Sequence, residues 1–204
     1  MSATAHRVET MTTITTKAAT PTEWEDVQRT LTGGGDGASC QCVWPVLRNK
    51  DWNATTKDER VGILRDEITT GPPPGIVAYV DGEAAGWIRI GPRPAQKRLG
   101  YTRNIVAATH EPLDDGGVWA VTCFSVRREH RGQGLNAALL AAAVDYARES
   151  GARVIEGYPV DTSAVTVSPN DLFHGALSTF LNAGFSVVGE LRSGRPLVAL
   201  ELAA

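Results

Sequence analysis

Residues 126–160 read VRREHRGQGLNAALLAAAVDYARESGARVIEGYPV. An arginine cluster and two glycines stand directly before an alanine- and leucine-rich run with helical spacing. A helix N-terminus has unpaired N–H groups and a partial positive charge, and glycine lets the backbone approach a ligand closely. Together with the arginines, these features suit a pyrophosphate. A tight turn beside a solvated arginine cluster is the alternative.

Two common phosphate-binding motifs do not fit this turn. A P-loop requires Lys followed by Ser or Thr after its second glycine, whereas Leu135 and Asn136 follow here. A dinucleotide-binding fold requires three glycines at fixed spacing and an acidic residue at the end of an early strand, and neither is present. The pyrophosphate therefore belongs to another class of ligand.

The elements around the turn form a strand–helix–strand unit. Residues 117–126 are almost continuously apolar, which predicts a strand that is buried on both faces. A helix is predicted over 135–150, closed by Gly151, and a second strand over 153–160. Because the connection needs a crossover, the two strands are expected to be parallel neighbours with a right-handed connection.

The remaining sequence predicts hairpins and further helices. Asp81 and Gly82 lie between two apolar runs and predict a tight turn. Residues 92–116 show no clean period and predict a long connection, either a solvated loop or a lid. Near the N-terminus, a first strand is predicted at 12–18, and a helix start at Thr20–Pro21. Thr56 and Glu59 predict a capping box at the start of another helix. A later helix is predicted to be capped by Ser168, with Pro169 and Asp171 in its first turn and Gly184 at its end, and two strands follow it.

Composition narrows the functional classes. The net charge of −3 argues against broad binding to nucleic acid or an anionic membrane, and no apolar run approaches the ~20 residues of a membrane span. The three cysteines are too few, and odd in number, for a disulfide framework, which indicates a reducing, cytoplasmic location. We expect a flexible tail at residues 1–11 and a single domain at 12–204.

Two motifs resemble those of the GNAT superfamily of acyl-CoA-dependent N-acetyltransferases. RGQGLN, residues 131–136, is similar to the family's Gln/Arg-x-x-Gly-x-Gly/Ala signature, with Asn136 in the last position. ALSTFLNAGF, residues 176–185, resembles the later helix that ends in Gly-Phe, and the order of elements also matches. The resemblance implies an α/β (α+β) fold with a mixed, mostly antiparallel twisted sheet, a central parallel strand pair and flanking helices.

The resemblance also implies a reaction and a set of binding residues. The chain would move an acetyl group from acetyl-CoA, its co-substrate, to a primary amine of a small molecule or protein by direct transfer in a ternary complex. The backbone of Phe124, Ser125 and Val126 would pair with the pantetheine amides. The pyrophosphate would be bound by Arg127, Arg128, Arg131, Gly132, Gln133, Gly134, Leu135 and Asn136.

One position departs from the family in a way that affects catalysis. Phe180 stands where the family often has a Tyr whose hydroxyl lies near the leaving sulfur, so the usual general acid is absent. The predicted substitutes follow the second parallel strand: Tyr158 as acid, Asp161 or Glu156 as base, and Ser178 and His174 as further donors. Each also has an ordinary structural role as core, turn or surface residue. A catalytically weak acyl-CoA binding or sensing module is therefore the alternative function.

The segment CQCVWPVLRNKDW, residues 40–52, is the remaining unusual stretch. No second pair of metal ligands follows it, so no metal site is expected. Trp44, Trp52 and the cysteines are expected either to line the acceptor site or to pack in the core. A thiol enzyme using Cys40 or Cys42 is a third reading.

The expected partners are acyl-CoA and an amine acceptor. No nucleic acid or membrane partner is expected, and the chain is expected to be a monomer or a homodimer.

Overall fold

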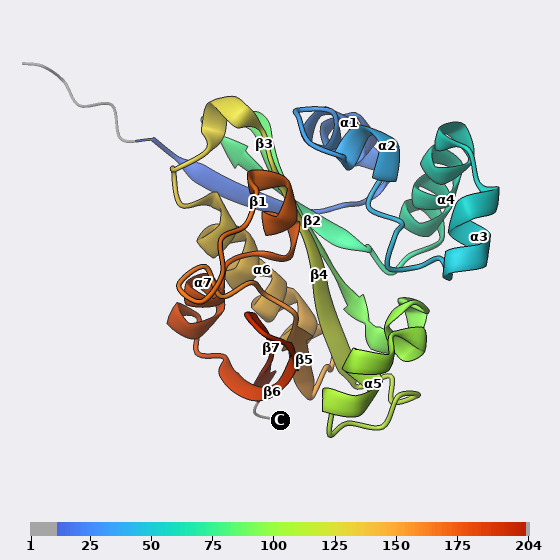
Figure 1. Ribbon diagram of the computed structural model, residues 1–204. Coiled ribbons are helices and arrows are strands. Elements are labelled where there is room, and N and C mark those ends of the chain that lie inside the picture. The colour runs from blue at the N-terminus through green and yellow to red at the C-terminus, as the bar shows by residue number, and fades with distance from the viewer. Residues whose placement is uncertain (1–11, 203–204) are drawn as a thin grey trace, which may run out of the picture.

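The computed structural model describes residues 12–202, with the backbone but not the side chains at 169–171. Its strands form a seven-stranded sheet in the order β1-β2-β3-β4-β5-β7-β6 (Figure 1). Neighbouring strands are antiparallel except β4 and β5, which are parallel. The predicted mixed sheet with a central parallel pair is confirmed. The predicted tail at 1–11 lies outside the described residues.

The elements have the following bounds. The strands are β1 (Ile14–Ala18), β2 (Gly75–Val80), β3 (Glu83–Pro92), β4 (Val118–Val126), β5 (Val154–Gly157), β6 (Ser186–Arg192) and β7 (Arg195–Glu201). The α-helices are α1 (Trp24–Leu31), α2 (Gly37–Cys40), α3 (Asn49–Ala54), α4 (Lys57–Thr70), α5 (Arg103–Ala108), α6 (Leu135–Glu149) and α7 (Leu177–Asn182). Short 3₁₀ turns are η1 (Pro21–Glu23), η2 (Arg93–Ala95), η3 (Leu99–Tyr101), η4 (Arg128–His130) and η5 (Pro169–His174).

Both faces of the sheet are covered by helices, as the apolar runs in its central strands require. In β2, Ile76 and Ala78 join the core that contains the buried side chains of α6, whereas Val77 and Tyr79 face the core beneath α1 and α4. The alternation follows the two-residue repeat of a strand. Helix α6 therefore lies on one face, and α1 and α4 lie on the other (Figure 1).

Two local sequence signals are confirmed in detail. Asp81 and Gly82 both have positive φ, 50° and 86°, as a type I′ turn requires, and they join β2 to β3. Thr56 caps α4, and its hydroxyl and the Glu59 carboxylate complete the reciprocal bonds of a capping box. These signals act within a few residues, so the sequence is sufficient to predict them.

The parallel strands β4 and β5 separate near their carboxyl ends. Their last paired residues are Val121 and Gly157, and β4 has a bulge just beyond, since Arg89 pairs with Cys123 while Ile90 pairs with Val121. Val160 lies in the continuation of β5 but pairs with a different segment. Its N–H donates to the Gly175 carbonyl, and its carbonyl accepts from the Leu177 N–H. The carboxyl-terminal half of β4 thus keeps an edge that β5 does not pair.

The predicted single helix from Ser168 to Gly184 is wrong. The structure has the 3₁₀ turn η5, a break at Gly175 and then the short helix α7. Gly175 has φ of 80°, and Ala176 forms a parallel bridge with Val160, so the backbone there serves strand pairing rather than a helix. The predicted cap signals at Pro169 and Asp171 concern side chains outside the described residues.

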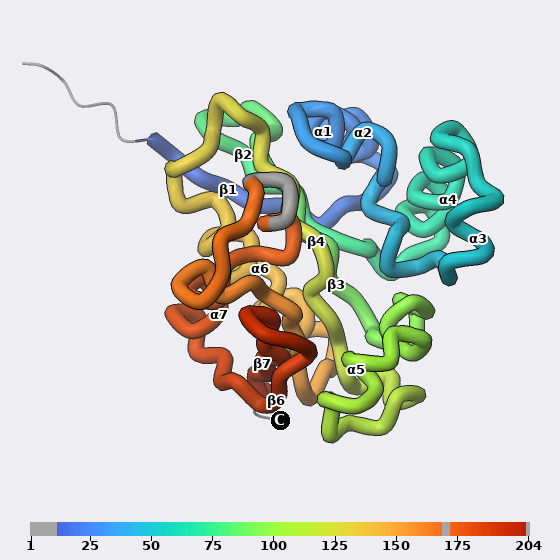
Figure 2. Tube along the Cα trace, in the orientation of Figure 1, coloured from blue at the N-terminus to red at the C-terminus, as the bar shows by residue number. Residues whose placement is uncertain are grey.

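The long connection after β3 is more ordered than a solvated loop. Figure 2 shows residues 93–117 as a compact segment beside the lower end of β4. Arg93 is 2% exposed and pairs with Glu156 at 2.9 Å, and Gln96 donates to the Ala120 carbonyl. Ile105 of α5 packs in a third buried cluster with Tyr158. This segment is therefore fastened to β4 and β5, and the expectation of a plain solvated loop is wrong.

An aromatic cluster joins α7 to the sheet. Phe180 is fully buried and makes edge-to-face contacts with Phe124 and Phe185 at centroid distances of 6.0 and 5.1 Å. Its ring lies against Gly157, where an added Cβ would come within 2.4 Å of Phe180 Cε1. Glycine at 157 is thus required by the close approach of the ring to β5.

Gly157→Ala is expected to lower the free energy of unfolding by about 1–3 kcal/mol, because the buried ring must move. Gly62→Ala is the matched control, since Gly62 lies inside α4 with nothing within 4 Å of an added Cβ. That change should raise stability by about 0.5–1 kcal/mol. Equilibrium urea unfolding measures both, and equal stability of Gly157→Ala and the unchanged protein would contradict this packing.

His174 lies where β4 and β5 have separated. Its ring lies close to the backbone of Thr122, and its buried Nδ1 has no hydrogen-bond partner among the described residues. Burial of the ring, aided by the positive charges of Arg195 and Arg192, lowers the pKa of His174 from 6.5 to about 3. The ring is therefore neutral in the folded protein at neutral pH.

The depressed pKa of His174 predicts an acid-dependent loss of stability. The pKa of His174 is lower in the folded protein than in the unfolded chain. The free energy of unfolding is therefore at its full value above about pH 6.5, and it falls by about 1.4 kcal/mol per pH unit as the pH drops toward 3. We expect His174→Gln to be less sensitive to pH than the unchanged protein between about pH 6 and about pH 4. Urea unfolding at several pH values measures this, with the exposed His110→Gln as control. Parallel curves for the protein and His174→Gln would refute it.

Candidate functional site

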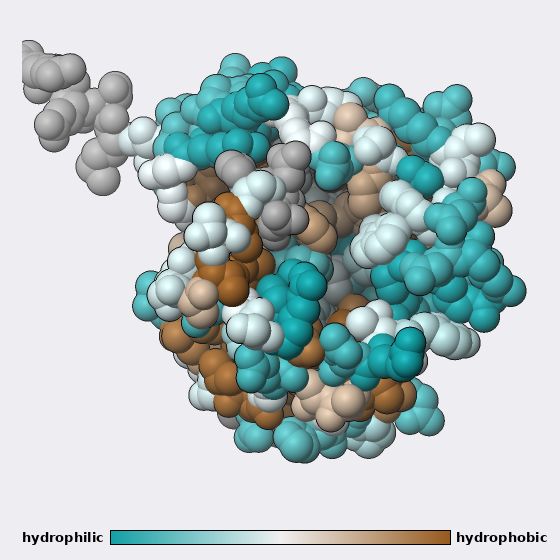
Figure 3. All heavy atoms as spheres, viewed as in Figure 1, coloured by the Kyte–Doolittle hydropathy of each residue, from teal (hydrophilic) through white to brown (hydrophobic). Residues whose placement is uncertain are grey.

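A cavity of about 710 Å³ opens beside the separated part of β4. Figure 3 shows that the face viewed in Figure 1 is hollowed near its centre. The cavity is bounded by the end of β4 and the start of α6, by the loop from α1 to α3, and by the region of η5 and α7. Its main lining residues are Gly34–Gly37, Ser39, Cys40, Cys42, Trp44, Trp52, Cys123–Val126, His130–Gly132, Gly134–Ala137, Leu172, Phe173 and Thr179.

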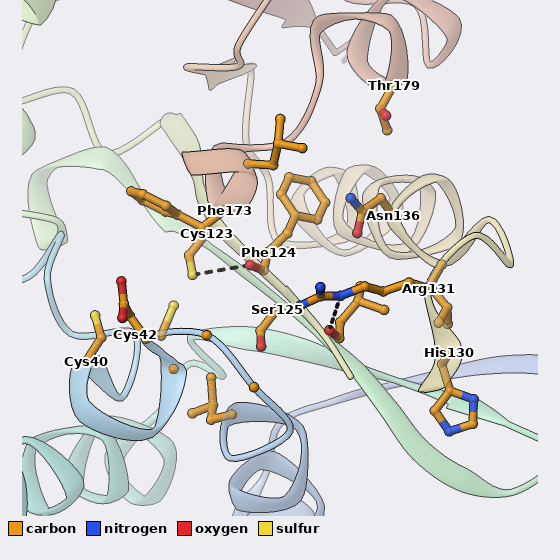
Figure 4. A pocket seen from close by; sticks show the side chains of 18 of the residues that line it. Cys40, Cys42, Cys123, Phe124, Ser125, His130, Arg131, Asn136, Phe173 and Thr179 are labelled. Carbon is orange, nitrogen blue, oxygen red and sulfur yellow. Dashed lines mark hydrogen bonds between the residues drawn. The ribbon is translucent and has the colours of Figure 1, made fainter. Parts of the chain in front are cut away.

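The end of β4 brings the predicted pantetheine-binding residues into this cavity. Phe124 and Ser125 line it (Figure 4), as does Val126, and all three belong to the part of the strand that β5 does not pair. A strand edge with unpaired N–H and C=O groups can add a further extended chain by hydrogen bonding. This edge can therefore accept a ligand that carries amide groups.

The start of α6 provides an anion-binding backbone at the other end of the cavity. Gly132 and Gly134 have φ of 77° and 80°, and nothing lies within 4 Å of the Cβ position at either. The first hydrogen bonds of the helix run from the N–H groups of Ala137 and Ala138 to the Gly134 carbonyl. The backbone N–H groups that come before Ala137 therefore take no part in the hydrogen bonds of the helix. Open space beside a helix N-terminus suits a phosphate group.

The arginines of the turn divide into two groups. Arg131 lines the cavity, and its Nε donates to the Val126 carbonyl at 3.4 Å (Figure 4). Arg127 instead pairs with Glu129 at 2.7 Å and donates to the Arg29 carbonyl, while Arg128 lies against Gly34. Among the predicted pyrophosphate ligands, Arg127, Arg128 and Gln133 do not line the cavity; Arg131, Gly132, Gly134, Leu135 and Asn136 do.

Glu156 and Tyr158 lie in a buried network outside the cavity lining. They are 1% and 2% exposed, and the Tyr158 hydroxyl donates to Glu156 Oε2 at 2.9 Å. Burial, the Glu156 charge and this hydrogen bond raise the pKa of Tyr158 well above its usual value. Glu156 also accepts hydrogen bonds from Arg93 and Thr109. The geometry gives both side chains a clear role in fastening the 93–117 segment.

The other catalytic candidates also lie outside the lining. Asp161 accepts from the backbone N–H and hydroxyl of Ser163, which makes it a turn residue at the surface. Ser178 is exposed on α7, whereas its neighbour Thr179 lines the cavity. Phe180, the residue that departs from the family pattern, is buried in the aromatic cluster. The catalytic roles of Tyr158, Asp161, Glu156 and Ser178 stay predictions.

All three cysteines of the chain line the same cavity. They come from two elements far apart in the sequence, with Cys40 and Cys42 on one side and Cys123 on β4 (Figure 4). Burial raises the pKa of the Cys42 thiol, but a hydrogen bond with Cys123 and the Arg89 charge outweigh it, and the net direction is downward. The cysteines are free thiols, and no group of three or more His, Cys, Asp or Glu suited to a metal ion occurs in the described part of the chain.

The wall opposite β4 was only partly expected from the sequence. The predicted Trp44 and Trp52 do line the cavity and meet edge to face at 4.8 Å. Sequence reasoning did not identify the Gly34–Gly37 loop, His130, Phe173 or Thr179. The glycine run at 33–35 was an available signal, because such a run permits close approach of a ligand.

Solved structures share this fold. YncA from Salmonella typhimurium, solved with acetyl-CoA, has a TM-score of 0.53 and 17% identity, over 93% of this chain and 94% of that one. PaiA N-acetyltransferase from Thermoplasma acidophilum, in complex with coenzyme A, has a TM-score of 0.54 and 11% identity, over 93% and 99%. A GNAT acetyltransferase from Listeria monocytogenes has a TM-score of 0.55 and 14% identity, over 93% and 95%.

The family assignment rests on the sequence itself. No curated protein matches the chain. No helix of residues 12–202 is both long and apolar enough to cross a membrane. The sequence model of the Acetyltransferase (GNAT) family matches residues 43–165, a range that includes β4, the glycine turn and α6. The chain therefore belongs to the GNAT acetyltransferase family.

Proposed function

We propose that the protein transfers an acetyl group from acetyl-CoA to a primary amine, of a small molecule or a protein, by direct transfer in a ternary complex. The observation that carries this proposal is the single cavity that connects the unpaired edge of β4 with the N-terminus of α6. Family membership supports the same reaction class, and structural neighbours hold acetyl-CoA or coenzyme A. Acetyl-CoA supplies the activated acetyl group as a thioester.

The proposed binding residues act mainly through their backbone. Phe124–Val126 pair with the amides of the pantetheine arm along the free strand edge, which keeps the extended arm in a fixed register. The N–H groups around Gly132 and Gly134 and the charge of Arg131 bind the pyrophosphate. Asn136 Oδ1 is buried and has no partner among the described residues, so it can accept a hydrogen bond from an N–H or O–H group of the ligand rather than from the pyrophosphate.

The acceptor amine is proposed to enter on the side of Cys40, Trp44 and Trp52. It must lose a proton before it attacks, because an alkyl amine with a pKa of about 10 is mostly charged at neutral pH. The predicted bases are not in the cavity lining, so water must connect them to the amine if they act. Tyr158→Phe tests the predicted acid: a role in catalysis requires lower turnover with unchanged acetyl-CoA binding.

A catalytically weak acyl-CoA binding module is the second candidate. Phe180 carries no hydroxyl and faces the core, and none of the four predicted catalytic side chains lines the cavity. Turnover separates the candidates. An enzyme releases free CoA when an amine is added, whereas a binding module retains acetyl-CoA without releasing CoA. Chromatographic quantification of CoA over a panel of amines gives the answer.

Arg131→Ala is expected to weaken acetyl-CoA binding about tenfold or more, because a charge-assisted contact to phosphate is lost. Arg148→Ala is the matched control, since Arg148 is an exposed arginine at the far end of α6 that pairs with Asp145. Calorimetric titration with acetyl-CoA measures both. Equal weakening by the two substitutions would show a general charge effect rather than a site, and no acetyl-CoA binding by the unchanged protein would end the proposal.

A further inference from the structure

A second, smaller pocket lies between α3 and η3. Its volume is about 250 Å³, and it is lined by Arg48, Asn49, Lys50, Arg98, Tyr101 and Thr102. The lining contains three cationic side chains and no carboxylate. Asp51 lies next to the pocket and pairs with Arg48 at 3.1 Å. It therefore does not neutralise the charges of Arg98 and Lys50. The pocket is therefore electropositive.

Arg98 differs from the other buried arginines. Of the arginines that are at least nine-tenths buried in residues 12–202, Arg89 pairs with Glu67 at 2.6 Å and Arg93 pairs with Glu156 at 2.9 Å. Arg98 is 9% exposed, yet no carboxylate of the described residues pairs with it. Buried charges in proteins are normally paired, because an uncompensated ion loses its hydration. Arg98 therefore lacks the carboxylate partner that the other two buried arginines have in the described residues.

The neutral contacts of Arg98 orient its guanidinium and leave one nitrogen unused. Nε donates to the Trp44 carbonyl at 2.6 Å, and Nη1 donates to Asn49 Oδ1. The guanidinium stacks on the Trp44 ring at 3.5 Å from the centroid. Nη2 is buried without a hydrogen-bond partner in the described structure. Because burial without a carboxylate also lowers the pKa of Arg98, an anion would relieve an existing cost.

Arg98 lies next to the large cavity as well as in the smaller pocket. It contacts both the ring and the carbonyl of Trp44, and Trp44 lines the large cavity. The neighbouring Trp52 ring is stacked by Arg60 at 3.5 Å. Two guanidinium groups therefore already occupy faces of this aromatic pair, and Asp36 is the only carboxylate residue in the described lining of the cavity. A second cationic centre on the acceptor would find little to balance it here.

We infer that the acceptor carries a carboxylate in addition to its amine, as an amino acid does, and that Arg98, with Lys50 and Arg48, binds this carboxylate while the amine lies in the large cavity beyond Trp44. The inference rests on the proposed acetyltransferase function and specifies its substrate class. Arginine suits the role because its planar fork matches the geometry of a carboxylate. Carboxylate binding fixes the position of the amine and selects against polyamines.

Matched pairs of amines test the carboxylate separately from the amine. The probes are para-(aminomethyl)benzoate with its carboxamide, and β-alanine with β-alaninamide. Calorimetric titration is performed with and without CoA, so binding is measured whether or not turnover occurs. We expect each carboxylate to bind about tenfold more tightly than its amide, and Arg98→Gln to remove that preference. In turnover, Arg98→Gln should raise KM for the carboxylate about tenfold and leave KM for the amide unchanged.

The controls address charge and folding. Lys97→Gln removes a neighbouring exposed charge that does not line the pocket, and it should retain the preference. Should Arg98→Gln fail to fold, Lys50→Gln on the surface should still reduce the preference about two- to fivefold. Equal binding of carboxylates and amides by the unchanged protein would overturn the inference. Carboxylate-selective binding without acetylation of any amine would support the subsite and refute the proposed reaction instead.

Discussion

The separation of β4 from β5 is the constraint on which the rest of this structure depends. It does not arise from a weakness of β4, which remains paired with β3 up to Val126. It arises because the continuation of β5 pairs with residues 175–177, and η5 packs against β4 in its place. Backbone groups away from water must be paired, so a strand that loses one neighbour needs another. In this family member the edge that remains free is the edge that borders the cavity.

Buried ion pairs hold the parts of the molecule that carry no regular pairing. Arg93 and Glu156 are 63 residues apart and join the long connection to β5, while Arg89 and Glu67 join β3 to α4. Such pairs contribute little net stability compared with apolar packing, but breaking one leaves a costly unpaired charge. They therefore specify which loop packs where. The same physical rule makes the unpaired Arg98 informative.

The sequence predicts those features that depend on neighbouring residues. Asp81 and Gly82 define a turn by their own dihedral preferences, and the arginine–glycine turn precedes a helix whatever lies around it. The break at Gly175 could not be predicted from neighbouring residues, because the helical sequence pattern continues across Gly175. The break results from backbone pairing of residues 175–177 with Val160, which is distant in the sequence. The burial of Tyr158 with Glu156 is equally nonlocal, and for that reason these two plausible catalytic residues lie outside the cavity lining. Most of the predicted binding residues line the cavity and none of the predicted catalytic residues does, and the roles of both groups stay predictions.

The placement of every cysteine in one cavity has a practical consequence. A thiol-specific alkylating reagent can modify this chain only at Cys40, Cys42 or Cys123, so the extent of labelling reports directly on access to the cavity. Occupancy of this cavity near the cysteines can then be followed by intact mass, with no engineered label. The same property makes colorimetric thiol reagents unsuitable for monitoring this protein, since they would consume its own side chains along with any product.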